Sequence, residues 1–130
     1  MKPLNDWLST TIRRARLLIE DSDRKNFSGI KLEQLIRRVN NLATTGAIRA
    51  PAPDVMERYQ TEDSVVLEFG WVDKKSGWHL YFSVRRPIGE KPYAQLDFSG
   101  AGEHTYTSDK PTDADITKSL HDYFESWRRR

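Results

Sequence analysis

The chain has 130 residues, of which 37% are hydrophobic and 31% are charged, and its net charge at neutral pH is +2. It is long enough to bury the core of one domain, and the absence of cysteine excludes disulfides, thiolate nucleophiles and sulfur-ligated metals. No apolar run approaches the roughly 18 residues of a membrane span, so no membrane partner is expected. We therefore expect one domain over residues 1–130 in a reducing compartment, most simply the cytoplasm.

Two amphipathic helices are predicted within residues 1–46, where they form a helical hairpin. Apolar residues recur at three- and four-residue spacing across residues 4–22 and again from Leu32 to Ala43, which is the pattern of a helix with one buried stripe. A polar break at residues 21–26 separates the two runs, and Gly46 stands where a helix can end in a left-handed residue. Two such helices joined by a short loop pack antiparallel.

The pattern changes after a proline-containing connector at residues 47–55. Proline lacks the amide donor that a helix needs, and it favours extended geometry in the residue before it. Over residues 56–108 the apolar period is two, which predicts a four-stranded antiparallel meander. Residues 56–62 leave a fifth strand open. The breaks between the strands hold the Gly, Pro and charged residues typical of hairpin loops.

A last helix is predicted over residues 112–128. Thr112 can cap its start, and acidic residues in the first turn and arginines in the last turn complement the helix dipole. The expected architecture is an α+β fold in which the helices pack on one face of the sheet. The other sheet face then meets either solvent or a partner.

The register of the hairpin at residues 70–82 decides the environment of two tryptophans. Pairing Val72 with Trp78 would split the apolar residues between the two sheet faces. A shift by one residue, with Gly77 as the left-handed residue of a bulge, sets Trp71 opposite Trp78 and unites the apolar rows. We favour this second register, in which the tryptophans are a cross-strand core pair rather than a ligand clamp. It also sets Phe69 opposite Leu80 and Leu67 opposite Phe82.

Strict alternation along the strands collects polar and aromatic side chains on the sheet face opposite the apolar rows. The predicted partner-binding residues of this face are His79, Tyr81, Arg85, Tyr93, Gln95 and Asp97. Tyrosine suits such a face because it offers a large contact area at a low cost in entropy. A plain solvated face, common in antiparallel sheets, is the competing interpretation. Stacking of nucleic-acid bases is disfavoured by the nearby carboxylates, which would repel phosphates.

A second candidate surface is basic and lies on the N-terminal helices. Residues 1–50 hold ten basic and five acidic side chains, a net charge of 10 − 5 = +5. The expected basic surface consists of Arg13, Arg16, Arg37 and Arg38, and such a surface could hold phosphates or an acidic protein. The competing interpretation is a solvated face held by the i,i+4 pairs Arg16–Glu20 and Glu33–Arg37.

The sequence contains no catalytic or cofactor motif that we recognise. The histidines, His79, His104 and His121, lack the spacing of metal ligands on one helix. Gly100-Ala101-Gly102 is not followed by the third glycine and helix of a dinucleotide-binding loop. We therefore expect a protein that is not an enzyme and holds no metal or cofactor.

The leading hypothesis is a small binding protein of the inhibitor, immunity or antitoxin kind, with another protein as its partner. It would act through the polar and aromatic sheet face or through the basic helices. The alternative is a nucleic-acid-binding protein that uses the basic helices. The chain is expected to be a monomer or a homodimer, and pairing of the edge strand near Tyr106 is one route to a dimer.

Overall fold

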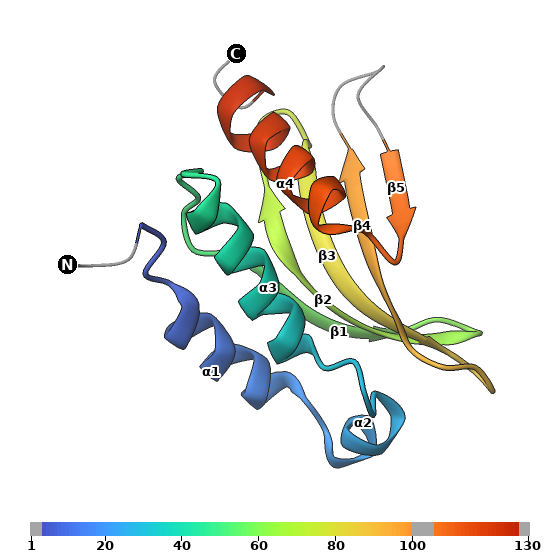
Figure 1. Cartoon of the computed structure of the whole chain (residues 1–130). Helices are drawn as coiled ribbons and strands as arrows, with labels where there is room; N and C mark the ends of the chain where they lie inside the picture. Colours follow the sequence, from blue (N-terminus) through green and yellow to red (C-terminus); the bar gives the residue numbers. More distant parts are fainter. Residues whose placement is uncertain (1–3, 100–105, 128–130) are drawn as a thin grey trace.

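A computed structural model describes residues 4–99 and 106–127 and has an α+β fold. The strands form one open antiparallel sheet in the order β1-β2-β3-β4-β5, and the helices lie on one side of it (Figure 1). In chain order the elements are α1 (Leu8–Leu18), α2 (Asp21–Asn26), α3 (Leu32–Thr45), β1 (Val55–Gln60), β2 (Ser64–Val72), β3 (His79–Pro87), β4 (Tyr93–Ser99), β5 (Tyr106–Asp109), α4 (Asp113–His121) and the π-helical segment η1 (Asp122–Trp127).

The first helix is shorter than predicted, because the chain turns extended at Ile19 (ψ 126°) and a separate helix, α2, occupies the expected polar break. The Glu20 N–H donates to Asp23 Oδ2 at 2.9 Å, which caps the start of α2. Asp23 is only 1% exposed. Its carboxylate accepts two hydrogen bonds from Arg58 of β1, from Nε at 2.9 Å and from Nη2 at 3.2 Å. This ion pair ties α2 to the edge of the sheet.

The sheet contains the fifth strand that the sequence left open, since β1 begins at Val55 and pairs with β2. The hairpin between β2 and β3 has a different register from the predicted one. Trp71 lies opposite Leu80, and Phe69 lies opposite Phe82. The predicted pairing of Trp71 with Trp78 is therefore wrong by two residues, although the predicted grouping of the apolar rows on one face is confirmed.

A longer turn than expected explains the displaced register. The Asp73 N–H donates to the Trp78 carbonyl at 2.7 Å, and the Gly77 N–H donates to the Asp73 carbonyl at 2.7 Å. These bonds close a turn of four residues between Asp73 and Trp78, so β3 begins only at His79. Gly77 has a φ of +78°, the left-handed conformation predicted for it.

Trp71 sits at the junction of the helices and the sheet. It is 1% exposed, and its ring meets Trp7, Phe82 and Phe124 edge-to-face at centroid distances of 6.0, 6.4 and 5.0 Å. Its Nε1 donates to the Pro51 carbonyl at 2.9 Å, in the connector between α3 and β1. Trp78 is only partly buried against the core, so the expected tryptophan pair is replaced by one central tryptophan and one at the margin.

The C-terminal helix starts as predicted. Thr112 Oγ1 accepts from the Asp115 N–H at 3.1 Å, and the Thr112 N–H donates to Asp115 Oδ2 at 2.9 Å, which is a reciprocal cap. After His121 the helix widens into η1, which ends at Trp127. Position 128, the predicted end of the helix, lies outside the described residues, as do His104 and the Gly100-Ala101-Gly102 segment.

Replacing Trp71 with Ala is expected to lower the free energy of unfolding by about 3–5 kcal/mol, because the aromatic cluster would surround an unfilled site. Trp78→Ala is the matched control: it removes the same ring from the margin of the core, with an expected loss of about 1–2 kcal/mol. Urea unfolding followed by circular dichroism measures both values. Equal losses would show that Trp71 has no special place in the core.

Candidate functional site

The sheet face turned away from the helices, here called the open face, collects the predicted binding residues. Residues directly opposite each other in an antiparallel pair share a face, and Tyr81 lies opposite Asp97 while Arg85 lies opposite Tyr93. Residues at alternate positions along each strand share that face as well. The structure therefore brings together all six residues of the predicted face, which are His79, Tyr81, Arg85, Tyr93, Gln95 and Asp97.

Strand β1 adds two residues to the open face that sequence analysis missed. Glu57 lies opposite Glu68, and Tyr59 lies opposite Val66. They were missed because residues 56–62 were left open as a fifth strand, and no sheet face was assigned to their side chains. Val66 also lies opposite Arg85, and it is fully buried although no helix of the described residues covers this face. The long side chains of the open face therefore pack over their own sheet.

The tyrosine at the centre of this face is held in place by its neighbours. A Cβ atom added to Gly70 would lie 2.9 Å from Tyr81 Cδ1, so the Tyr81 ring occupies the space above that glycine. The His79 ring stacks on the Tyr81 ring, with a centroid distance of 4.2 Å and an interplanar angle of 12°. His79 Nε2 lies 3.1 Å from Asp97 Oδ2. The His79–Tyr81 stack is therefore an ordered aromatic part of the open face.

Glu68 is the most perturbed carboxyl group of the open face. Burial, followed by the negative charges of Glu57 and Asp97, raises the pKa of Glu68 from 4.5 to about 7. The Tyr59 hydroxyl, 3.5 Å from Glu68 Oε2, and the charge of Arg85 oppose that rise in pKa. Burial and the charge of Glu68 also raise the pKa of Tyr59. Glu68 therefore exchanges its proton near neutral pH.

The strand residues of the open face carry an excess of negative charge. Asp109 of β5 lies opposite Gln95, whose Nε2 donates to Asp109 Oδ1 at 2.7 Å. These strand residues include four acidic side chains and one basic side chain, that of Arg85. With Glu68 ionised, their net charge is therefore 1 − 4 = −3. The acidic residues are Glu57, Glu68, Asp97 and Asp109. A cationic partner is therefore favoured electrostatically.

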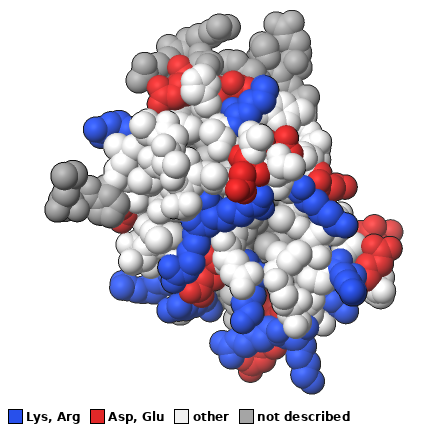
Figure 2. Space-filling model, in the orientation of Figure 1, with Lys and Arg blue, Asp and Glu red and all other residues white. Residues whose placement is uncertain are grey.

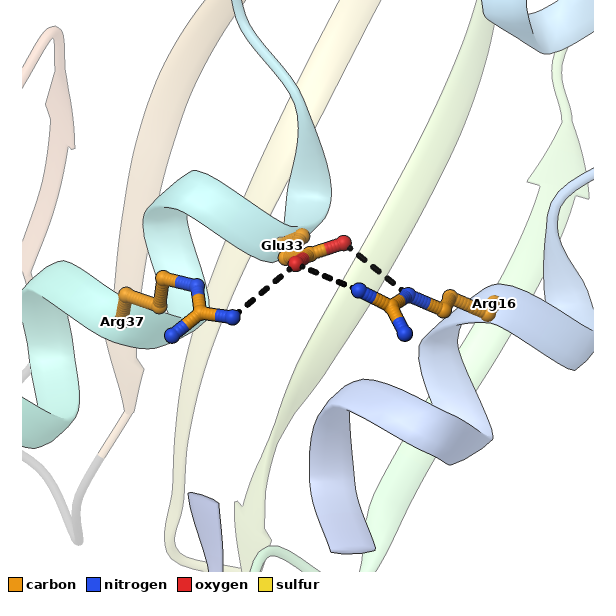
Figure 3. Close-up of polar contacts among 3 residues, drawn as sticks. All are labelled: Arg16, Glu33 and Arg37. Atoms are coloured by element: carbon orange, nitrogen blue, oxygen red, sulfur yellow. Dashed lines mark hydrogen bonds and ion pairs between the residues drawn. The ribbon is translucent and has the colours of Figure 1, made fainter. Parts of the chain in front are cut away.

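The predicted basic surface lies on the opposite side of the molecule. Figure 2 shows Lys and Arg side chains gathered over α1, α2 and α3, with acidic side chains among them. Arg16 donates to both oxygens of Glu33, from Nε at 3.2 Å and from Nη2 at 2.9 Å, and Arg37 donates to Glu33 Oε1 at 3.1 Å (Figure 3). These hydrogen bonds lower the pKa of Glu33.

The arginines of the predicted basic surface form ion pairs that differ in part from the expected ones. The Glu33–Arg37 pair is confirmed, whereas Arg16 pairs with Glu33 in place of Glu20. Arg38 donates to Asp113 Oδ1 at 2.7 Å and to the Pro111 carbonyl at 3.0 Å, which joins α3 to the start of α4. Arg13 is exposed on α1. Three of the four predicted basic residues are thus bound to carboxylates of the same chain.

Comparisons of the chain with protein-family models, with curated proteins and with solved structures find no match. Within residues 4–99 and 106–127, the His, Asp and Glu side chains form no cluster able to hold a metal ion. Over the same ranges, no helix has both the length and the apolar character to cross a membrane.

Glu68→Gln is expected to remove a pH dependence of stability. The folded state raises the pKa of Glu68 above its ordinary value, so its contribution to stability is fully present below about pH 4.5 and declines as the pH rises through about 7. Between pH 5 and pH 8 the wild type should lose about 1–2 kcal/mol of unfolding free energy relative to the variant, allowing for solvent screening. Urea unfolding of both proteins at the two pH values measures this difference; a constant difference would contradict the assignment.

Proposed function

We propose that the protein is a binding protein that recognises a basic surface of another protein through the open face. The observation that carries this proposal is the ordered stack of His79 on Tyr81, set among the carboxylates of Glu57, Glu68 and Asp97. The helices within residues 4–99 and 106–127 all lie on the other face of the sheet. Ordered tyrosines lose little entropy on binding. The surrounding acids add attraction for Lys and Arg side chains, which also favour aromatic faces.

A role of the inhibitor, immunity or antitoxin kind fits this proposal. Such proteins act by binding alone, and the chain offers a small domain with one preorganised face. The absence of cysteine favours the cytoplasm as the place of action. This class is proposed for the whole chain, whereas the open face is proposed as its contact surface.

A protein partner is favoured over a nucleic acid by the charges of the two surfaces. The carboxylates of the open face repel phosphates. On the helices, Arg16 and Arg37 share Glu33, and Arg38 is bound to Asp113. The paired carboxylates offset part of the positive charge of these guanidinium groups, which weakens their attraction for the many phosphates of a nucleic acid. Binding of nucleic acid through the basic helices is the alternative outcome of the following experiment.

The test compares two double variants that each remove two carboxylates. Glu57→Gln with Asp97→Asn changes the open face, while Glu62→Gln with Glu90→Gln changes exposed residues in the turns beside it. The tagged wild type and both double variants are used to capture partners from the host lysate, with and without nuclease. A captured protein is then purified and titrated against the wild type and each variant. We expect a stoichiometric complex that the open-face variant weakens by about tenfold or more and the control variant by less than about threefold.

Three results would overturn the proposal. The first is that nuclease abolishes the capture of partners and that Arg13→Gln and Arg37→Gln abolish binding. This result would establish nucleic-acid binding through the helices. Another is a complex that both carboxylate variants weaken equally. The third is a purified protein that binds only a second copy of itself through the β5 edge, seen as a dimer by light scattering.

A further inference from the structure

A pocket of about 340 Å³ lies between α1, α2, α3 and the helix-facing side of β2. Figure 1 shows that α2 lies beyond the neighbouring ends of α1 and α3, where the three helices meet. Phe27, Leu32 and Leu67 line the pocket and are almost fully buried, so they form its apolar floor. The volume falls within the range of roughly 300–1,000 Å³ that small-ligand sites occupy.

The mouth of the pocket is basic. Arg16, Arg24 and Lys31 line it and are exposed to solvent. Arg24 donates to Asp21 Oδ1 at 3.2 Å. The side chain of Arg16 is 65% exposed, yet its two hydrogen bonds to Glu33 fix the plane of its guanidinium. A guanidinium has five N–H donors. The two bonds to Glu33 use one N–H on Nε and one on Nη2, so three N–H donors of Arg16 are left to bind an anion.

The acidic residues of the pocket are neutralised by arginines. Glu33 accepts from Arg16 and from Arg37 (Figure 3), so this cluster keeps a net charge of 2 − 1 = +1. Both carboxylate oxygens of Asp23 accept a hydrogen bond from the guanidinium of Arg58. An anion at the mouth would therefore meet a positive potential although two carboxylates line the pocket.

We propose that this pocket binds a small amphipathic anion, with its phosphate or carboxylate group between Arg16 and Lys31 and its apolar body on Phe27, Leu32 and Leu67. The charged mouth selects for the anionic group, and the buried floor excludes a fully hydrated ion. The pocket lies on the helix-facing side of the sheet, so this site is independent of the open face. The ligand could come from a lipid or from a free metabolite, because both offer an anionic head on an apolar chain.

The test uses three soluble probes: n-octyl phosphate, inorganic phosphate and 1-octanol. Isothermal titration measures their affinities, and amide NMR shifts locate the bound probe. We expect octyl phosphate to bind at least about tenfold more tightly than either of the other probes, since only it offers both groups. Arg16→Gln and Lys31→Gln should each weaken its binding by about tenfold, the value of one charge-assisted hydrogen bond.

Arg13→Gln is the matched control, because Arg13 is an exposed arginine of the same helix that does not line the pocket. It should change the affinity for octyl phosphate by less than about twofold. A thermal melt of each variant verifies folding; if Arg16→Gln fails to fold, Lys31→Gln carries the comparison. Equal effects of Arg13→Gln and Arg16→Gln, equal affinity for octyl phosphate and for phosphate or octanol, or NMR shifts away from Phe27 and Leu32 would each overturn the proposal.

A vesicle assay separates the two sources of the ligand. Phosphatidylglycerol vesicles that retain the wild type but not Arg16→Gln, together with binding of octyl phosphate in the pocket, identify a lipid as the source. Binding of octyl phosphate in the pocket without retention on vesicles identifies a free amphiphile. Retention on vesicles with no binding of octyl phosphate would reject the pocket in favour of a surface attraction.

Discussion

The burial of Trp71 is the constraint on which the arrangement of the molecule depends. Its ring contacts Trp7 before α1 and Phe124 in η1, and its indole N–H holds the connector at Pro51. Residues from both ends of the chain thus meet at one side chain of β2. Because a residue of this size must be enclosed on every side to be dry, the helices must lie on the face of the sheet that carries Trp71. The opposite face is left for other contacts.

This division explains why the two sides of the molecule differ in charge. Helices covering one sheet face bring their own outer stripes to the surface, and on α1 and α3 those stripes hold arginines. The open face keeps the polar residues that alternate with the core, among them Glu68 beside Glu57. Burial and like charge make ionisation of Glu68 costly, a cost that a cationic partner would offset. The acidic, aromatic open face and the basic surface of the helices therefore both follow from the packing of the helices on one face of the sheet.

The sequence predicted those features that depend on local pattern. Alternation placed Tyr81 and Arg85 on one face, and the cap at Thr112 marked the start of α4. It did not predict features that depend on distant partners. Nothing local to Asp23 signals its burial, because Arg58, which binds it, lies on another element. The register at Trp71 was missed because turn hydrogen bonds, rather than the apolar rows, set the loop length. The place of Glu57 on the open face and the pocket between α1, α2 and α3 could be found only from the tertiary structure.

The most direct test of the division into a face covered by helices and a face proposed to bind a partner is cross-saturation NMR on the complex with the captured partner. Protons of the partner are saturated, and the loss of amide signal is read along the isotope-labelled chain. We expect the strongest losses of signal on β2, β3 and β4, at residues such as Glu68, Tyr81 and Asp97. Losses concentrated on α1 and α3, with the strands unaffected, would contradict it.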